Sequence, residues 1–332
     1  MHGRFLRTEG EPRQRPQGTR ANPYGKARRY PIVAQKTRLT RIDPDDTVRV
    51  SRNIERAKSL LNRMGASPKK ALGQNFLVDE GVLGVILEAA QLSRDDTVVE
   101  IGPGLGVLTR ALAERTKKVI AVELDDALAS MLERSLGNWP NVSIVRGDIL
   151  RIEPWKELPP GSHYKVVSNL PYNIASPTLR RFLSAPTKPS LVVIMTQREV
   201  AQEIAAPPDK MRLLSVMVQF YARAEIVAEV PPQRISPPPK VTSAIVRLKP
   251  YETPQVEVLD PEAFFAFVAD GFAQPRKQLS NSLAHGLRVS PAQAGEWLSR
   301  AGIDPHRRAE TVTLREWAML WDVVSQSNEA LA

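Results

Sequence analysis

The chain has 332 residues, which is enough for two domains and a sizeable hydrophobic core. It has no cysteine, which excludes disulfides and cysteine-ligated metal sites, and no apolar run of the length that a membrane-spanning helix needs. Its net charge of +10 is uneven, because residues 1–70 carry 18 Lys and Arg against 6 Asp and Glu, which predicts a basic arm that either contacts a polyanion or is only solvated.

The amino-terminal part of the chain is expected to be an extension ahead of the folded part. Residues 1–50 are rich in Arg, Pro, Gly and Gln and have few large apolar side chains, a composition typical of disorder. Residues 51–64 then place apolar side chains at helical spacing, which predicts a first helix of the folded part. The segment 73–77 follows on a predicted loop, and residues 79–91 are expected to form a second helix.

Residues 97–113 combine a short apolar strand, a glycine-rich turn and a helix. Gly102, Gly104 and Gly106 alternate through the turn, where they let a ligand approach the backbone closely. The pattern differs from the dinucleotide fingerprint, which needs glycine at position 107, where this chain has Val. It indicates a nucleotide-binding crossover, with a plain tight turn as the alternative.

Strands and helices alternate between residues 97 and 248, which predicts a mainly parallel sheet with helices on both faces. The predicted strands are residues 97–101, 118–123, 142–145, 165–168, 191–195, 225–230 and 241–248. We expect the last two strands to add an antiparallel edge. Beyond residue 254 the pattern becomes helical, with helix-start signals at Asp260, Ser290 and Thr313.

Two carboxylates follow successive predicted strands at their carboxyl ends, where open α/β sheets bind ligands. Glu123 ends the second strand and can accept both hydroxyls of a ribose. Asp148 follows the third strand and can accept an adenine amino group. Together they indicate a cofactor that contains adenosine, although either acid alone could be a surface or capping carboxylate.

The fourth strand ends in the run Asn169, Leu170, Pro171 and Tyr172. Asn169 offers a carbonyl acceptor, Pro171 stiffens the turn, and Tyr172 presents a flat face for a base. Such a set suits an exocyclic amine, because two acceptors that hold the amine hydrogens direct its lone pair at an electrophile without a strong base. The alternative is a turn residue, Asn169, beside a core aromatic, Tyr172.

Six motifs together resemble the ribosomal RNA adenine dimethylases, in order and with family-like spacing over residues 52–330. They are GQNFL (73–77), EIGPGLGVLT (100–109), AVELD (121–125), GDIL (147–150), NLPYNI (169–174) and PPPKVTSAIVRL (237–248). NLPY is the family's form of a motif of amino-group methyltransferases, and PRKQLSNSL (275–283) resembles the family's carboxyl-terminal signature. The resemblance is greatest to the small-subunit, kasugamycin-resistance branch.

This resemblance implies a Rossmann-like class I methyltransferase sheet, a small all-α carboxyl-terminal domain, and S-adenosylmethionine as cofactor without a metal. Carried over position by position, it implies cofactor contacts at Asn75 and Leu77 near the methionine part, Gly102 and Gly104 in the turn, Glu123 at the ribose, Asp148 at the adenine and Asn169. It also implies that the catalytic residues are Asn169, Leu170, Pro171 and Tyr172, with Tyr172 stacked on the target base.

The implied reaction is methyl transfer, twice per base, to N6 of two adjacent adenosines in the 3′-terminal hairpin loop of small-subunit rRNA. The base must leave its stack to react, so unpaired loop RNA is the easier target. The implied partner is rRNA in a pre-30S-like particle, with a role in small-subunit biogenesis. The enzyme is expected to be monomeric, cytoplasmic and not bound to a membrane.

The chain is therefore expected to divide into a basic extension (1–50), a methyltransferase domain (51–252) and a helical, RNA-contacting domain (253–332). Basic residues that could contact the RNA backbone in the last domain are Arg276, Lys277, Arg288, Arg300, Arg307 and Arg308. A solvated surface is the alternative for these side chains.

Two positions depart from the family pattern: Ile235 stands where the family usually has Phe as a second stacking wall, and Glu203 stands where it often has Arg, which would alter an RNA contact. Ile can pack against a base but has no π face. Two other functions stay open: methylation of large-subunit RNA, which relatives of the family perform, and a non-enzymatic RNA clamp in ribosome assembly. The GQNFL and PPPKV motifs favour the small subunit, and an intact NLPY motif with Glu123 favours catalysis.

Overall fold

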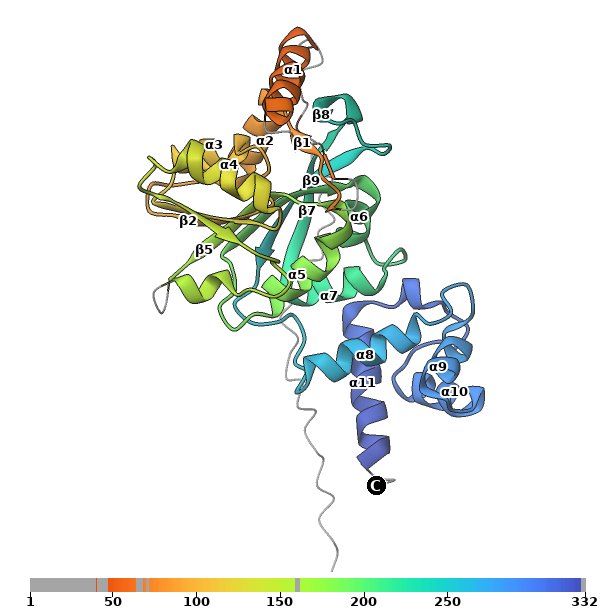
Figure 1. The fold of residues 1–332 in the computed structure, drawn as a ribbon. Coiled ribbons are helices and arrows are strands. Elements are labelled where there is room, and N and C mark those ends of the chain that lie inside the picture. Colours follow the sequence, from red (N-terminus) through yellow and green to blue (C-terminus); the bar gives the residue numbers. More distant parts are fainter. Residues whose placement is uncertain (1–39, 41–46, 64–67, 70–71, 159–161, 330–332) are drawn as a thin grey trace, which may run out of the picture. The chain divides into compact units, whose positions relative to one another are not determined.

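The computed structural model describes residues 40, 47–63, 68–69, 72–158 and 162–329. The described residues all belong to one compact unit (Figure 1). Apart from residue 40 and residues 47–50, the extension that we expected to be disordered lies outside the described residues. The predicted division into three parts stays a prediction.

The first helix, α1 (Thr47–Arg63), begins four residues before the predicted start and belongs to the folded part. Val50, Ala57 and Leu61 on one of its faces are buried in an apolar cluster that also contains Leu132. The helix is therefore held by an apolar face, as its spacing predicted.

The central sheet has seven strands in the order β4-β3-β2-β5-β6-β9-β7. The strands are β2 (Thr97–Ile101), β3 (Lys118–Glu123), β4 (Val142–Arg146), β5 (Tyr164–Asn169), β6 (Leu191–Gln197), β7 (Ala222–Val230) and β9 (Ser243–Pro250). Neighbours from β4 to β6 are parallel, whereas β9 pairs antiparallel with both β6 and β7. The predicted parallel sheet with an antiparallel edge is confirmed.

Helices cover both faces of the sheet, as predicted (Figure 1). They are α2 (Glu80–Ala90), α3 (Val107–Ala113), α4 (Asp126–Leu136), α5 (Ala175–Ser184), α6 (Arg198–Ile204) and α7 (Leu213–Tyr221). Val98 and Val119 pack with residues of α2 and α3, whereas Val99 and Ile120 pack with residues of α5 and α7. Successive side chains of a strand point to opposite faces, so an uninterrupted apolar strand fits a sheet buried on both sides.

Four helices follow the sheet: α8 (Pro261–Gly271), α9 (Leu279–Leu287), α10 (Pro291–Arg300) and α11 (Leu314–Glu329). The predicted caps are present, since Asp260 and Ser290 accept hydrogen bonds from the first turns of α8 and α10. Ahead of α11, the Thr313 backbone N–H donates to Glu316 Oε2 at 2.8 Å, which confirms the predicted capping box. Trp317 of α11 is fully buried in the core that this part shares with one face of the sheet.

A separate two-stranded sheet joins the amino-terminal segment to the proline-rich connection before β9. β1 (Phe76–Leu77) pairs antiparallel with β8 (Ile235–Ser236). The prediction of a loop for residues 73–77 is therefore wrong at Phe76 and Leu77. These two residues form a strand only by pairing with residues 235–236, which lie far away in the sequence. A buried ion pair of 2.6 Å between Arg234 and Asp79 holds the same corner together.

Candidate active site

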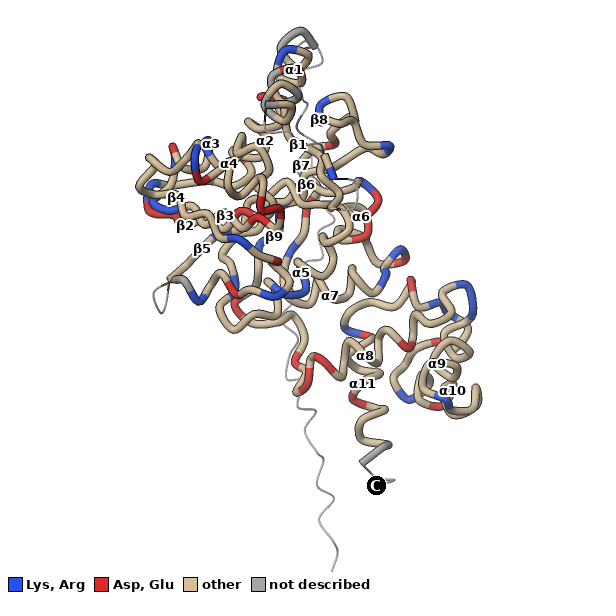
Figure 2. Tube along the Cα trace, in the orientation of Figure 1, with Lys and Arg blue, Asp and Glu red and all other residues tan. Residues whose placement is uncertain are grey.

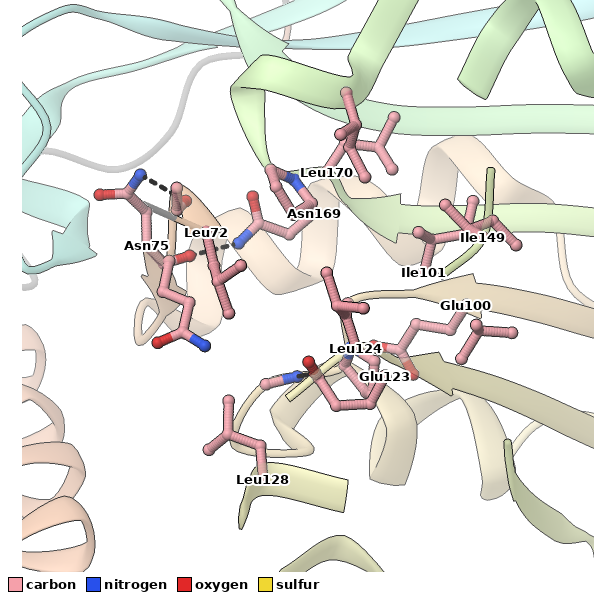
Figure 3. A pocket seen from close by; sticks show the side chains of 18 of the residues that line it. Leu72, Asn75, Glu100, Ile101, Glu123, Leu124, Leu128, Ile149, Asn169 and Leu170 are labelled. Atoms are coloured by element: carbon pink, nitrogen blue, oxygen red, sulfur yellow. Dashed lines mark hydrogen bonds between the residues drawn. The ribbon is translucent and has the colours of Figure 1, made fainter. Parts of the chain in front are cut away.

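A pocket lies at the carboxyl ends of β2, β3, β4 and β5, the edge at which open α/β sheets bind ligands (Figure 3). The residues predicted to bind the cofactor all line it: Asn75, Leu77, Gly102, Gly104, Glu123, Asp148 and Asn169. Leu170 and Pro171 of the predicted catalytic run also line the pocket, but Tyr172 is not among the lining residues. The fold thus gathers predicted residues from five separate segments.

The glycine turn after β2 forms the floor of this pocket. Gly102 and Gly104 have φ angles of +65° and +57°, a left-handed conformation that side chains with a Cβ rarely adopt. A Cβ at position 104 would lie 2.9 Å from Cδ1 of Phe76, so the turn and β1 could not pack as they do. The two glycines therefore allow both the tight turn and the close approach of β1.

Glu123 ends β3 as a buried carboxylate that two backbone groups hold in place. The Gly104 N–H donates to Oε2 at 3.1 Å and the Asp125 N–H donates to Oε1 at 2.9 Å. Burial raises the pKa of the Glu123 carboxyl, and these two N–H donors oppose the rise. Because each carboxylate oxygen has two acceptor sites, each can still accept one further hydrogen bond from a ligand.

Asp148 lies beside apolar side chains at the end of the pocket that follows β4. Its Oδ1 accepts the Leu150 N–H at 2.9 Å. Leu124 and Ile149 line the pocket nearby, and Leu124 is 52% exposed, which is unusual for a large apolar side chain. Leu124 was not predicted as a site residue, although an apolar residue directly after a strand-end acid is a signal that could have found it. A purine face fits such an exposed leucine, and the role of Asp148 as acceptor for a purine amino group stays a prediction.

The amide of Asn169 is held in one orientation at the end of β5. Its Nδ2 donates to the backbone carbonyl oxygen of Asn75 at 2.8 Å (Figure 3). This bond occupies the NH₂ side of the amide, so Oδ1 remains as an acceptor for a ligand. The predicted acceptor role of Asn169 thus has a geometric basis, and it depends on the segment that carries Asn75.

Tyr172 begins the 3₁₀ turn Tyr172–Ile174, and its chain neighbours Pro171 and Asn173 both line the pocket. Its hydroxyl is 2.5 Å from Oγ of Ser243, the buried first residue of β9. Burial raises the pKa of the Tyr172 phenol, so the group stays neutral at physiological pH. Its stacking on a target base stays a prediction.

Ile235, which stands where the family usually has Phe, lies in the core. Its side chain is 1% exposed and packs in the apolar cluster that contains Leu77 and Ile86. Its strand β8 pairs with β1, and this pairing directs the side chain into the core.

Glu100, inside β2, was not predicted as a site residue although it lines the pocket. It is 1% exposed, and its Oε2 has no hydrogen-bond partner among the described residues. Burial raises the pKa of the Glu100 carboxyl to about 8, Thr109 lowers it and the nearby Glu123 raises it further. A single acid inside an apolar strand was the available sequence signal.

Replacing Glu100 with Gln should reduce the pH dependence of the free energy of unfolding. The pKa of Glu100 is about 8 in the folded chain against 4.5 for an ordinary glutamate, so the folded state retains a proton that the unfolded state releases. The contribution of Glu100 to stability should therefore be most favourable below pH 4.5 and fall as the pH rises to 8, by about 1.4 kcal/mol per pH unit between the two pKa values.

Urea unfolding at pH 5, 6, 7 and 8 measures the slope, and the difference between wild type and Glu100→Gln gives the share of Glu100. Glu133→Gln is the control, because Glu133 is half-exposed and pairs with Arg146 on the surface. An unchanged slope in Glu100→Gln would contradict the assignment.

Within the ranges that the structure describes, no group of three or more His, Asp or Glu side chains could hold a metal ion. In the same ranges no helix has both the length and the apolar character to cross a membrane.

Comparison with known sequences agrees with this geometry. The profile of the family described as "Ribosomal RNA adenine dimethylase" matches residues 65–326. A "Ribosomal RNA small subunit methyltransferase A" of Dehalococcoides mccartyi is 44% identical over 274 residues, which are 82% of this chain and 94% of the relative. A protein of the same name from Shouchella clausii is 40% identical over 277 residues, 81% of this chain and 94% of the relative.

Solved structures show the same fold. The crystal structure of the 23S rRNA methyltransferase ErmE is similar with a TM-score of 0.59 and 32% identity, covering 75% of this chain and 99% of that one. A dimethyladenosine transferase from Plasmodium falciparum has a TM-score of 0.62 and 22% identity, covering 75% of this chain and 96% of the other.

Proposed function

The chain belongs to the ribosomal RNA adenine dimethylase family, and from this premise we propose that it dimethylates N6 of two adjacent adenosines near the 3′ end of small-subunit rRNA. The observation that carries the proposal is the Asn169 amide, which Asn75 orients at the same pocket that holds Glu123 and Asp148. The small subunit is favoured because relatives named for it are 38–44% identical, against 32% for the 23S rRNA methyltransferase ErmE.

The pocket fits S-adenosylmethionine as the methyl donor. The glycine turn leaves no Cβ between backbone and ligand, Glu123 keeps acceptor sites for ribose hydroxyls, and Leu124 offers an apolar surface to adenine. When bound, the cofactor supplies an electrophilic methyl group on a sulfonium.

The chain's own contribution to the reaction is to hold and orient the adenine amine. Asn169 Oδ1 accepts one hydrogen of N6, and a backbone carbonyl of the Leu170–Pro171 turn accepts the other. These two acceptors direct the N6 lone pair at the methyl group, and the proton that N6 loses leaves to water. Orientation of this kind can supply much of the rate enhancement without a strong base.

The helical part beyond residue 252 is proposed to position the RNA. Figure 2 shows Lys and Arg on α1 and around α9 and α10. Arg276, Lys277 and Arg288 are exposed and suited to phosphate contacts, which fix register while the pocket selects the base. Arg307 is less available, because it forms a 2.5 Å ion pair with Glu316. A pre-30S-like particle as substrate, a monomeric enzyme and a cytoplasmic location complete the proposal.

Methyl transfer to isolated ribosomal particles tests this function. The full chain is incubated with methyl-labelled cofactor and with undermodified small or large subunits. We expect label in N6,N6-dimethyladenine of the small-subunit RNA, in two adjacent nucleotides. Label in large-subunit RNA alone would replace the proposed substrate, and no label while a known dimethylase labels the same particles would exclude the activity.

Two variants of Tyr172 test whether its ring stacks on the target base. Tyr172→Phe keeps the ring and loses only the hydroxyl contact with Ser243, so methyl transfer should stay close to the wild-type rate. Tyr172→Ala removes the ring and should lower kcat/KM for the RNA about tenfold, the size of one base–aromatic stack. Cofactor affinity, measured by calorimetry, should not change in either variant. Equal activity of the two variants would show that the ring does not stack on the base.

A further inference from the structure

Asp125 has no role in the function proposed above, yet its side chain makes contacts with two separate segments. It is 4% exposed and is not among the residues that line the pocket. Its Oδ1 accepts the Ala127 N–H at 3.0 Å and caps α4, an ordinary role for aspartate. The cap uses one oxygen, so the contacts of the second oxygen need another explanation.

The second oxygen binds two residues that lie far upstream in the chain. Asp125 Oδ2 is 2.8 Å from Lys69 Nζ and accepts a hydrogen bond of 3.1 Å from Gln74 Nε2. The other end of the Gln74 amide accepts the Lys69 backbone N–H at 2.7 Å. Although burial acts in the opposite direction, Lys69 and Gln74 hold the pKa of the Asp125 carboxyl below its usual range.

Gln74 belongs to a continuous run of residues, 72–77, all of which line the pocket. We refer to residues 72–77 as the pocket wall. Its next residue, Asn75, offers its backbone carbonyl oxygen to Asn169 Nδ2 at 2.8 Å. The wall therefore touches Asp125 on one side and the proposed catalytic amide on the other.

Asp125 is also joined to the residue proposed to hold the ribose, because its backbone N–H donates to Glu123 Oε1 at 2.9 Å. A chain of hydrogen bonds thus links Glu123 and Asp125, then Asp125 and Gln74. A further hydrogen bond links Asn75, the neighbour of Gln74, with Asn169. These contacts join the two ends of the pocket through a buried carboxylate.

We propose that Asp125 is a positioning residue for methyl transfer, which fixes the pocket wall through Gln74 and Lys69 and thereby fixes the amide of Asn169. The catalytic part of this inference rests on the proposed function. If the hydrogen bond between Asp125 and Gln74 is broken, the pocket wall can move. The cofactor is then bound less tightly, and Asn169 Oδ1 is no longer positioned to accept a hydrogen bond from the amine. Small misplacements of this kind lower rates strongly, because transfer needs aligned reacting atoms.

The hydrogen bond between Asp125 and Gln74 can be tested by exchanging the carboxylate and the amide between the two positions. Gln74→Glu keeps the acceptor for the Lys69 N–H but sets a second carboxylate against Asp125 Oδ2, at a place where the structure has an N–H donor 3.1 Å away. Adding Asp125→Asn restores one donor and one acceptor in the reverse direction. Asn caps helices as well as Asp does, so the start of α4 is retained in the double variant.

Single-turnover transfer from labelled cofactor to small-subunit particles should fall about 10- to 100-fold in Gln74→Glu. S-adenosylmethionine affinity, measured by calorimetry, should fall in the same variant. Both should recover a large part of the loss in Gln74→Glu/Asp125→Asn, although not all of it, because the Asn amide has no charge to pair with Lys69. Glu133→Gln, which breaks an exposed ion pair on the same helix, is the control and should leave rate and affinity unchanged.

Wild-type rate and affinity in Gln74→Glu would overturn the inference, even if its melting temperature fell, since Asp125 would then act on stability alone. A double variant as impaired as the single one would also overturn it. If the wild-type chain methylated no small-subunit RNA, the proposed function would fail, whereas the affinity series would still decide whether Asp125 holds the pocket wall.

Discussion

Asn169→Ala is expected to lower the single-turnover rate of methyl transfer on the order of 10²–10³-fold, the usual effect of removing one group that stabilises a transition state. The side chain ends β5 at the pocket, and its Nδ2 is already bound to the Asn75 carbonyl. In the proposed mechanism its Oδ1 is the acceptor that orients the amine. Affinity for S-adenosylmethionine should change only severalfold, because Glu123, Asp148 and the glycine turn remain.

Rapid-quench measurement with labelled cofactor and small-subunit particles gives the rate, and calorimetry gives the affinity. Asn138→Ala is the control, because Asn138 is exposed and is not among the residues that line the pocket. A wild-type rate in Asn169→Ala would contradict the catalytic assignment. A parallel loss of cofactor affinity would instead assign Asn169 to the cofactor.

Glu123→Ala should weaken S-adenosylmethionine binding about 100-fold or more, since two hydrogen bonds to a charged group contribute about 1.5–3 kcal/mol each. The carboxylate is buried at the end of β3, and backbone N–H groups hold it with acceptor sites to spare. Glu123→Gln keeps the shape and should show an intermediate loss. Binding at wild-type strength in the Ala variant would remove Glu123 from the ribose site.

The pH dependence of S-adenosylmethionine binding is a second test of the role of the Glu123 carboxylate. Burial raises the pKa of Glu123, so acidification protonates its carboxyl sooner than that of an exposed glutamate. S-adenosylmethionine affinity of the wild type should therefore weaken as the pH is lowered, beginning at a higher pH than an exposed glutamate would give. Glu123→Gln carries no titratable group at this position and should lack this loss, whereas Glu133→Gln should retain it.

Much of the sheet could be predicted from local sequence. Residues 97–101 and 118–123 have the predicted bounds in the structure, because strands buried on both faces are mostly apolar runs between breaking residues. Glu123 and Asp148 could be placed at one edge for the same reason, since parallel strands bring their carboxyl ends together.

The errors and omissions concern contacts between distant segments. Phe76 and Leu77 form a strand only because residues 235–236 pair with them, and that pairing buries Ile235. Glu100 has a raised pKa because helices and strands remove water from both sides of β2. Neither result follows from the neighbouring residues in the chain.

By itself, the sequence determined the sheet, the strand-end acids and the family, because these depend on apolar runs, on turn residues and on motifs a few residues long. Only the tertiary structure decided which side chains contact one another. It joined Asp125 to Gln74 and Asn75 to Asn169 across long stretches of chain, and it placed Ile235 in the core. Burial and hydrogen bonding depend on which distant segments the fold brings together, and no local pattern encodes that.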